Sequence, residues 1–406
     1  MVVVTGDGWE GTLSKPTGHP CEPPEPQDRT ATPGRGAILR STSRSGATET
    51  APRQQAIDHV AAHAEARRAA ARQTIEHICR MSNLALDVID ALIRQLQSHA
   101  CVALHFHPDR LAGDGRSVAE ALRDDGIYRN QFETHLSNGM LSPERGGPRD
   151  RWENELFGDA YLAPDLPLSL RPRYGALALM GHADGPSPRF GSSYFVLNPS
   201  CSQRSTFCFG DSHENPPARG VWTQWDDVLA ALMTESFLRG SALGRGDIRP
   251  AALVESLRTN LGRARPLPSQ RSASRNLDQY IEAQVHGEVL LQRDVDLLVA
   301  DPSFRGTPIE EALAVLCERY DVRLLWHGGF ALRVQDVPTD FRGPTMPALA
   351  QRVASAGVVT AAEIGVAAAE LKHAPERWAA FGPPADALQA LKLLWHVLLR
   401  YGQYGR

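Results

Sequence analysis

The clearest pattern of polar and apolar residues in the chain is an alternation in segment 280–289. Glu282, Gln284, His286 and Glu288 occupy every second position, and the residues between them are almost all apolar. On a β-strand this spacing places the four polar side chains on one face, with an apolar face behind it. Acids, an amide and an imidazole suit proton transfer and hydrogen bonding to a hydroxyl. The pattern therefore predicts a strand whose polar face belongs to a functional site.

The first hundred residues of the chain divide into two kinds of sequence. Residues 1–50 are rich in Pro, Gly, Ser, Thr and Arg and lack a hydrophobic period, which predicts disorder. From residue 53 to 99, apolar residues recur at spacings of three and four, which predicts two amphipathic helices with a break near Ser82 and Asn83.

Short apolar runs separated by Gly, Pro, Asn and Asp fill the region from 101 to about 334 and predict strands. They are CVALHFH, RYGALALMGH, SSYFVLNP, STFCFGDS, YIEAQVHGEVLL, VRLLWH and FALRVQ. Helices are expected at 118–125, 225–239 and 309–320, and again beyond 344, where residues 395–401 suit a packed terminal helix. The chain is therefore divided into a disordered segment (1–50), a helical segment (51–100), an α+β domain (101–335) and a C-terminal helical segment (336–406).

Composition and sequence motifs do not identify a function, but they argue against several classes of protein. The 43 Lys and Arg residues nearly balance 47 Asp and Glu, which argues against general nucleic-acid binding. The six cysteines include no CxxC pair, and their mostly apolar contexts indicate reduced thiols. No apolar run is long enough to span a bilayer, and MVVVTGDGWEG does not resemble a Sec signal peptide. The sequence contains no P-loop pattern, no HExxH pattern and no GxGxxG that follows a predicted strand.

The segment LHFHPDR contains the first group of candidate ligand-binding residues. Arg110 follows a predicted strand and precedes a glycine loop, a position suited to gripping a phosphate or pyrophosphate. His105 and His107 share a strand face and form a His-x-His pair that could instead bind zinc. A purely structural role for these residues is the third interpretation.

The segment YRNQFETHLSNG is the second candidate, because it is densely polar and ends in a turn-prone Ser137-Asn138-Gly139. Phe132 could stack on a flat ring while Ser137 and backbone N–H groups bind it, although a solvent-exposed turn is the alternative. Tyr174-Gly175 and Phe190-Gly191 each place a glycine at the start of a strand, where another backbone or a ligand can approach closely.

Other residues are weaker candidates. Trp152 and Phe157 are interpreted as core. Asp211-Ser212-His213 is discounted as a hydrolytic triad, because neighbours in sequence are seldom partners in space and no GxSxG elbow accompanies them.

The order of an arginine, a serine segment and a distant glutamate strand resembles ADP-ribosyltransferases of the arginine–serine–glutamate type. More specifically, LHFHPDR, YRNQFETHLSNG, RDRWENELFGDAY, RPRYGALAL, SPRFGSSYF and YIEAQVHG together resemble a bacterial family of unknown-function domains, which is associated with CteC-like effectors that ADP-ribosylate ubiquitin on threonine. The resemblance covers about residues 101–330. It implies an ADP-ribosyltransferase-like split β-sandwich with flanking helices, NAD as the cofactor, and two facing antiparallel sheets with a cleft between them.

The resemblance assigns roles to individual residues. Arg110 becomes the NAD-binding and catalytic arginine, Glu282 the catalytic glutamate, and Phe132 and Ser137 line the nicotinamide site. The remaining expected NAD-binding residues are His107, Asn138, Gly139, Tyr174 and Gln284. Transferases of this type usually carry Glu or Gln two residues before the catalytic glutamate. Here that order is reversed, so Glu288 is kept as an alternative acid and Glu282 is preferred.

The expected activity is mono-ADP-ribosylation of a protein acceptor, with ubiquitin threonine as one candidate, by a bacterial effector or toxin. No resident metal, nucleic-acid partner or membrane span is expected. The protein is expected in the cytoplasm of the producing cell, with secretion into a host or target cell as a further possibility. Two alternatives remain: a metal-dependent hydrolase using His105 and His107 with His182, His286 or Asp301, and a nucleotide-binding module without catalysis.

Overall fold

The structure is a computed structural model, and it describes residues 45–135, 143–261 and 267–405. Residues 43–406 form one compact unit. The expected disordered segment, 1–50, lies outside the described residues except for its last six, which belong to helix α1. The mixed α/β class expected from the sequence is confirmed.

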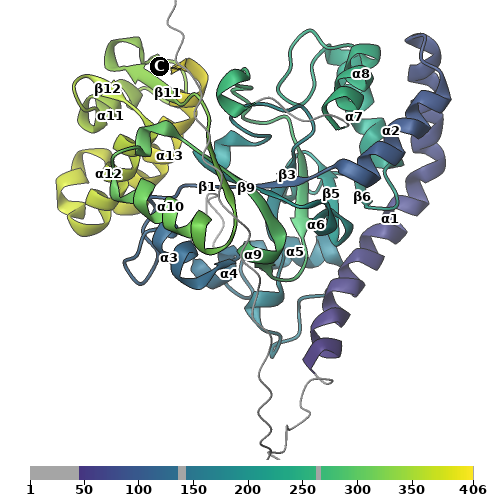
Figure 1. Cartoon of the computed structure of the whole chain (residues 1–406), viewed down its shortest axis with the longest axis horizontal. Helices are drawn as coiled ribbons and strands as arrows, with labels where there is room; N and C mark the ends of the chain where they lie inside the picture. Colours follow the sequence, from purple (N-terminus) through teal and green to yellow (C-terminus); the bar gives the residue numbers. More distant parts are fainter. Residues whose placement is uncertain (1–44, 136–142, 262–266, 406) are drawn as a thin grey trace, which may run out of the picture. The chain divides into compact units, whose positions relative to one another are not determined.

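Thirteen α-helices are present in the described ranges (Figure 1). They are α1 (Ser45–Met81), α2 (Leu86–His99), α3 (Val118–Asp125), α4 (Gln131–Thr134), α5 (Pro148–Phe157), α6 (Pro199–Gln203), α7 (Asp226–Arg239), α8 (Pro250–Leu261), α9 (Leu291–Asp294), α10 (Pro308–Arg319), α11 (Met346–Val353), α12 (Ala361–His373) and α13 (Pro384–Tyr401).

The local sequence explains several helix boundaries. The predicted break between the first two helices falls at Ser82–Ala85, between α1 and α2. Helix α3 matches its predicted range because Ser117 forms a capping box with Glu120 and Gly126 ends the helix in the left-handed conformation, at φ 68°. The terminal helix α13 begins eleven residues earlier than expected, at Pro384.

Eight strands form the main sheet, in the order β10-β9-β4-β1-β3-β7-β5-β6. Their bounds are β1 (Val102–Phe106), β3 (Arg173–Leu177), β4 (Ser193–Leu197), β5 (Ser205–Phe209), β6 (Arg219–Val221), β7 (Ile281–Val285), β9 (Val295–Ala300) and β10 (Arg323–Trp326). Neighbouring strands are antiparallel except β9 and β10, which are parallel and are joined through α10.

Two small sheets complete the strands of the described residues. One pairs β2 (Ile127–Tyr128) with β8 (Val289–Leu290), and the other has the order β12-β11-β13. The strands of the second are β11 (Phe330–Arg333), β12 (Val358–Val359) and β13 (Gln403–Tyr404). One eight-stranded sheet therefore stands where two facing antiparallel sheets were expected, and the unpredicted strand β9 extends it by pairing with both β4 and β10.

Close backbone packing in the sheet explains two of the glycines selected from the sequence. A Cβ atom at Gly175 would lie 2.4 Å from the carbonyl oxygen of Ala103 on the neighbouring strand. At Gly191 it would lie 2.3 Å from the backbone of Phe106. Both glycines therefore allow the backbone of β1 to approach closely. Close approach of another backbone is one of the two roles expected for them, the other being close approach of a ligand.

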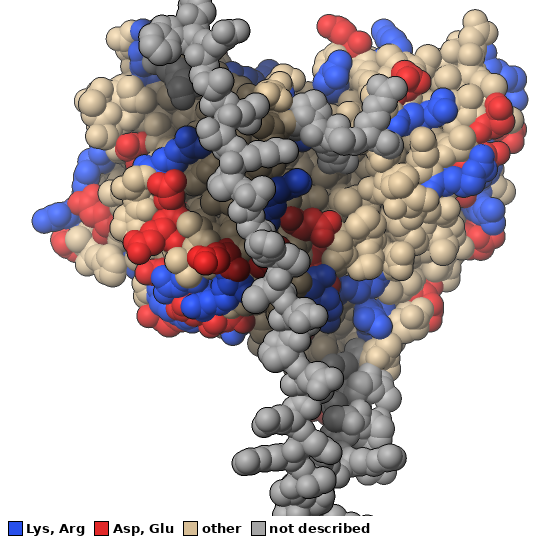
Figure 2. Space-filling view, viewed as in Figure 1, with Lys and Arg blue, Asp and Glu red and all other residues tan. Residues whose placement is uncertain are grey.

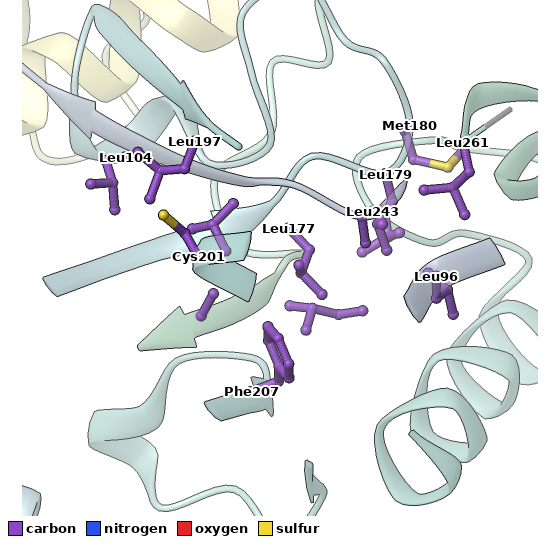
Figure 3. Packing of buried hydrophobic residues seen from close by; sticks show 14 of the residues in the cluster. Leu96, Leu104, Leu177, Leu179, Met180, Leu197, Cys201, Phe207, Leu243 and Leu261 are labelled. Carbon is purple, nitrogen blue, oxygen red and sulfur yellow. The ribbon is translucent and has the colours of Figure 1, made fainter. Parts of the chain in front are cut away.

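Two large apolar cores and two smaller clusters pack the helices against the strands in the described residues. The larger core lies on the sheet face that carries Leu104, Leu177 and Phe207, together with residues of α2, α7 and α8 (Figure 3). The second core joins α11, α12 and α13 to β11, with Trp378 and Trp395 among its largest buried side chains. In Figure 1, α1 and α2 lie on one side of the strands and α11, α12 and α13 on the other.

Candidate active site

The face of the sheet turned away from the larger core is polar around β7, whereas its other part carries a small apolar cluster of Ala103, Ala178, Tyr194 and Val299. Residues directly opposite each other on antiparallel strands point to the same face. The register pairs Glu282 with Ala176 on β3 and Cys208 on β5, and it pairs Gln284 with Tyr174 and Thr206. The intervening Ala283 and Val285 belong to the apolar core. The alternation in the sequence therefore predicted the two faces of β7 correctly.

Glu282 is held at the end of this polar face by two hydrogen bonds. Nε2 of Gln284 donates to Oε1 over 2.8 Å, and the backbone N–H of Ser212 donates to Oε2 over 3.3 Å. The side chain is buried, with 6% of its surface exposed. Burial, aided by the negative charge of nearby Asp211, raises the pKa of Glu282 to about 7. The carboxyl group therefore changes charge near neutral pH.

A chain of buried hydrogen bonds continues from Glu282 along the sheet. The hydroxyl of Thr206 donates to Oε1 of Gln284 over 2.7 Å and lies 3.0 Å from Nε2 of His286. The other ring nitrogen of His286 lies 2.7 Å from the hydroxyl of Tyr161. Burial lowers the pKa of His286 to about 3, so its ring is neutral. This network fixes Gln284, and through it the orientation of the Glu282 carboxylate.

Glu282 and Arg110 line the same cavity, although 172 positions separate them in the sequence. The cavity has a volume of about 490 Å³, within the range of small-molecule sites. Residues of β1 and its exit, α3, the α4 segment, α5, β3, η2 (Pro188–Phe190), η3 (Ser212–Glu214), β7 and α13 form its walls.

Positive charge dominates the cavity. Seven Lys or Arg side chains line it against two carboxylates, Asp211 and Glu282; the cations are Arg110, Arg129, Arg149, Arg173, Arg189, Arg342 and Lys392. Arg129, Arg173 and Arg189 have carboxylate partners in Asp125, Glu133 and Asp278. The guanidinium of Arg110 makes no ion pair or hydrogen bond within the described ranges. An anionic ligand would offset this surplus of positive charge.

The charges outside the cavity are more balanced. Over α3, acidic and basic side chains gather close together, at the lower left of Figure 2. There Arg116 pairs with Asp114, Asp124 and Asp125. The positive surplus is thus a property of the cavity and not of this neighbouring surface.

An aromatic wall stands beside the charged groups. The rings of Trp152 and Tyr174 lie 5.4 Å apart, and the guanidinium of Arg149 lies 4.7 Å from the Trp152 ring. The hydroxyl of Tyr174 donates to Glu153 over 2.7 Å, and Glu153 in turn pairs with the buried Arg171. Flat rings next to cations are suited to a ligand that joins a heterocycle to phosphate.

Helix α13 supplies the wall on the Arg110 side. Lys392 and His396 occur one helical turn apart and both line the cavity. Burial, followed by repulsion from Arg110, lowers the pKa of Lys392 to about 8. His107 lies close to the same cations, and burial together with Arg110 lowers its pKa well below the usual value. The C-terminal helical segment therefore contributes directly to the candidate site.

The remaining predicted site residues divide into three groups. His107 and Tyr174 line the same cavity as Arg110 and Glu282. Gln284 is fully buried and contacts Glu282 rather than the cavity. Ser137, Asn138 and Gly139 lie outside the described residues.

Two of the assignments need correction. Phe132 is buried away from the cavity, because the guanidinium of Arg171 covers its ring at 4.0 Å from the centroid. Glu288 is exposed and does not continue the polar face, because β7 ends at Val285 and Gly287 turns the chain at φ 78°. Glu288 is therefore not placed to act as the catalytic acid in this cavity.

Three of the four histidines proposed for a metal-dependent hydrolase already have hydrogen-bond partners within the protein. His105 lies 3.1 Å from the carbonyl oxygen of Gly191 and accepts from the backbone N–H of Ser187. His182 lies 2.8 Å from the carbonyl oxygen of Leu243 and lines a second cavity, of about 360 Å³. Both nitrogens of His286 face hydroxyl groups. Among the described residues, no group of three or more His, Cys, Asp or Glu side chains is placed to hold a metal ion.

Sequence reasoning missed several cavity residues. Arg149 and Asp211 were not selected, Trp152 was assigned to the core, and Arg342, Lys392 and His396 lie in a segment given no role in the site. One available signal was in α13, where the polar residues Gln389, Lys392 and His396 recur at spacings of three and four and so share one side of the helix.

The fold and the cavity define a mixed α/β protein with a basic, aromatic-walled cavity as its candidate ligand site. A family model matches residues 101–401, which include every described residue named above as lining this site. The chain belongs to this family, DUF3626, whose members are described as proteins of unknown function. No curated protein gives a significant match to the chain. In the described part of the chain, no helix has both the length and the apolar character needed to cross a membrane.

Proposed function

We propose that this protein is an NAD-dependent mono-ADP-ribosyltransferase that modifies a protein acceptor. The observation that carries the proposal is the presence of Arg110 and Glu282 in the walls of one cavity that has a large surplus of positive charge. In the proposed role the protein is a bacterial effector or toxin, made in the cytoplasm and acting on a host or target cell. A ubiquitin threonine is the candidate acceptor.

Different parts of the cavity suit different parts of NAD. Arg110 can grip the pyrophosphate, since a guanidinium binds two phosphate oxygens at once. Trp152 and Tyr174 offer rings on which a flat base can stack. The cavity is large enough for a ligand of this class to be substantially enclosed.

Glu282 suits the position at which positive charge develops. When the bond from the ribose to nicotinamide breaks, the ribose carbon acquires oxocarbenium character, which a fixed carboxylate stabilises. The same carboxylate can accept a hydrogen bond from a ribose hydroxyl. Because Gln284 and the Ser212 N–H already orient it, little reorganisation is needed during the reaction. A bound nicotinamide ribosyl cation would also lower the pKa of Glu282 and favour its charged form.

Release of nicotinamide and transfer of ADP-ribose by purified variants test the proposal. Glu282→Gln should reduce turnover by about 10²–10³-fold with little change in NAD affinity, because it removes a charge used in the transition state. Arg110→Ala should weaken NAD binding first, because that contact exists in the ground state. Glu288→Gln is the matched control and should remain active, because Glu288 is exposed outside the cavity.

Three outcomes would contradict the proposal or part of it. Full activity in Glu282→Gln would remove the proposed electrostatic role. A loss confined to Glu288→Gln would transfer that role to Glu288. NAD binding without any release of nicotinamide would instead support a nucleotide-binding module, for which the basic cavity is equally suited.

A further inference from the structure

An acid–base pair, Asp211 and His213, lies beside Glu282. Both residues line the cavity, and Asp211 caps the short helix η3 that contains His213. Nδ1 of His213 lies 2.8 Å from Oδ1 of Asp211, and the hydroxyl of Tyr280 donates to Oδ2 over 3.0 Å. A carboxylate that is fixed on one side and paired with an imidazole on the other is an arrangement that orients a histidine as a general base.

The backbone of η3 places this pair next to the candidate catalytic glutamate. Ser212, the residue between Asp211 and His213, donates its backbone N–H to Oε2 of Glu282. The Ser212 side chain itself is fully buried, so it is not available as a nucleophile. The His213 side chain is 47% exposed and can meet a molecule that enters from solvent.

We propose that His213, oriented by Asp211, is the base that removes the proton from an acceptor hydroxyl. This inference rests on the proposed transferase function. In the step, the acceptor oxygen forms a bond to the ribose carbon, and the bond from that carbon to nicotinamide breaks with its electron pair going to nicotinamide. The hydroxyl proton passes to the imidazole of His213 and then to solvent.

Charge at this end of the cavity limits the class of acceptor. Asp211 and Glu282 are the two carboxylates among the described residues that line the cavity, and both lie at this end, so an anionic acceptor would be repelled. A neutral hydroxyl is not repelled, but it must lose its proton to become part of the product. The geometry therefore points to a serine or threonine hydroxyl as acceptor, in preference to a carboxylate.

Two small nucleophiles separate base catalysis from the first half of the reaction. Methanol carries a proton that must be removed, whereas pyridine is neutral and attacks without proton transfer. The full-length chain is incubated with NAD and either nucleophile, and methyl ADP-ribose and the pyridine dinucleotide are quantified. His213→Ala should reduce methanolysis by about 10²-fold and leave base exchange with pyridine and NAD affinity unchanged. Added imidazole should restore methanolysis. His373→Ala, at an exposed histidine in the last turn of α12, is the control and should behave as wild type.

The outcomes that overturn the inference differ from one another. Unchanged methanolysis in His213→Ala would exclude a base role, and an equal loss with both nucleophiles would show that His213 acts before acceptor attack. If the wild-type chain releases no nicotinamide with either nucleophile, the proposed transferase function fails and this inference fails with it.

Discussion

At the scale of single residues, the alternation on β7 was sufficient to predict that Glu282 lies on a polar strand face, and the structure places it in the wall of a cavity. The same alternation predicted that Gln284 lies beside Glu282. Gln284 does not line the cavity, however, because it is fully buried and its amide group donates to Glu282. Phe132 could not be placed from the sequence, since its environment is set by Arg171, which approaches from 39 positions away.

The raised pKa of Glu282 leads to a prediction about stability. An acid whose pKa is higher in the folded state, about 7, than in the unfolded state, 4.5, stabilises the fold below pH 4.5. This contribution is lost as the pH rises through 7. Between pH 5 and pH 8 the wild-type free energy of unfolding should fall by about 2–3 kcal/mol more than that of Glu282→Gln.

Denaturant titrations of both proteins across this pH range provide the measurement. Comparing the two slopes isolates Glu282, because other titrating groups, such as Asp109 with its raised pKa of about 7, are present in both proteins. Parallel pH profiles for the two proteins would show that Glu282 is not buried as a titrating acid.

At the scale of elements, the sequence predicted the helices better than their role in the site. Helix α3 was predicted with both ends correct because its caps are encoded locally. Helix α13 was expected only in part, from 395 to 401, and its contribution to the cavity was not foreseen. Its approach to Arg110 depends on tertiary packing, including the bond from Nε1 of Trp395 to the carbonyl oxygen of Pro188, which no local pattern reveals.

The contribution of α13 can be tested at Lys392. Lys392→Gln should weaken binding of ADP-ribose by about tenfold or more, because it removes one charge-assisted contact from the anion site. The loss should shrink at high salt. Arg400→Gln, at an exposed arginine in the last turn of α13 that does not line the cavity, is the matched control and should bind normally. Calorimetric titrations at two salt concentrations would show this, and equal affinities for the two variants would exclude Lys392 from the site.

At the scale of the whole molecule, the order of the strands could not be predicted from the sequence. Seven predicted runs each contain a strand of the structure, but their pairing depends on contacts between distant segments. The run VDLLVA was not recognised as a strand, and as β9 it connects β4 with β10. The sequence also separated 101–335 from 336–406, whereas the cavity has walls from both ranges.

This shared wall predicts the behaviour of a shortened chain. A fragment of residues 43–335 keeps α1 and α2, lacks α13 and exposes the apolar surface of β11 that packs against α11–α13 in the second core. It should bind NAD far more weakly than residues 43–406, bind the hydrophobic dye ANS and unfold less cooperatively. Calorimetry and thermal melts would measure these effects. Equal NAD affinity in the two fragments would contradict the assignment of α13 to the site.

The most direct test of the central claim is an experimental structure of Glu282→Gln with NAD bound. This variant retains the cavity but should turn over slowly enough for the intact dinucleotide to remain. We expect the pyrophosphate at Arg110 and the nicotinamide ribose at position 282, within the cavity shared by β1, β7 and α13. A dinucleotide bound at another surface, or an empty cavity at millimolar NAD, would contradict the account.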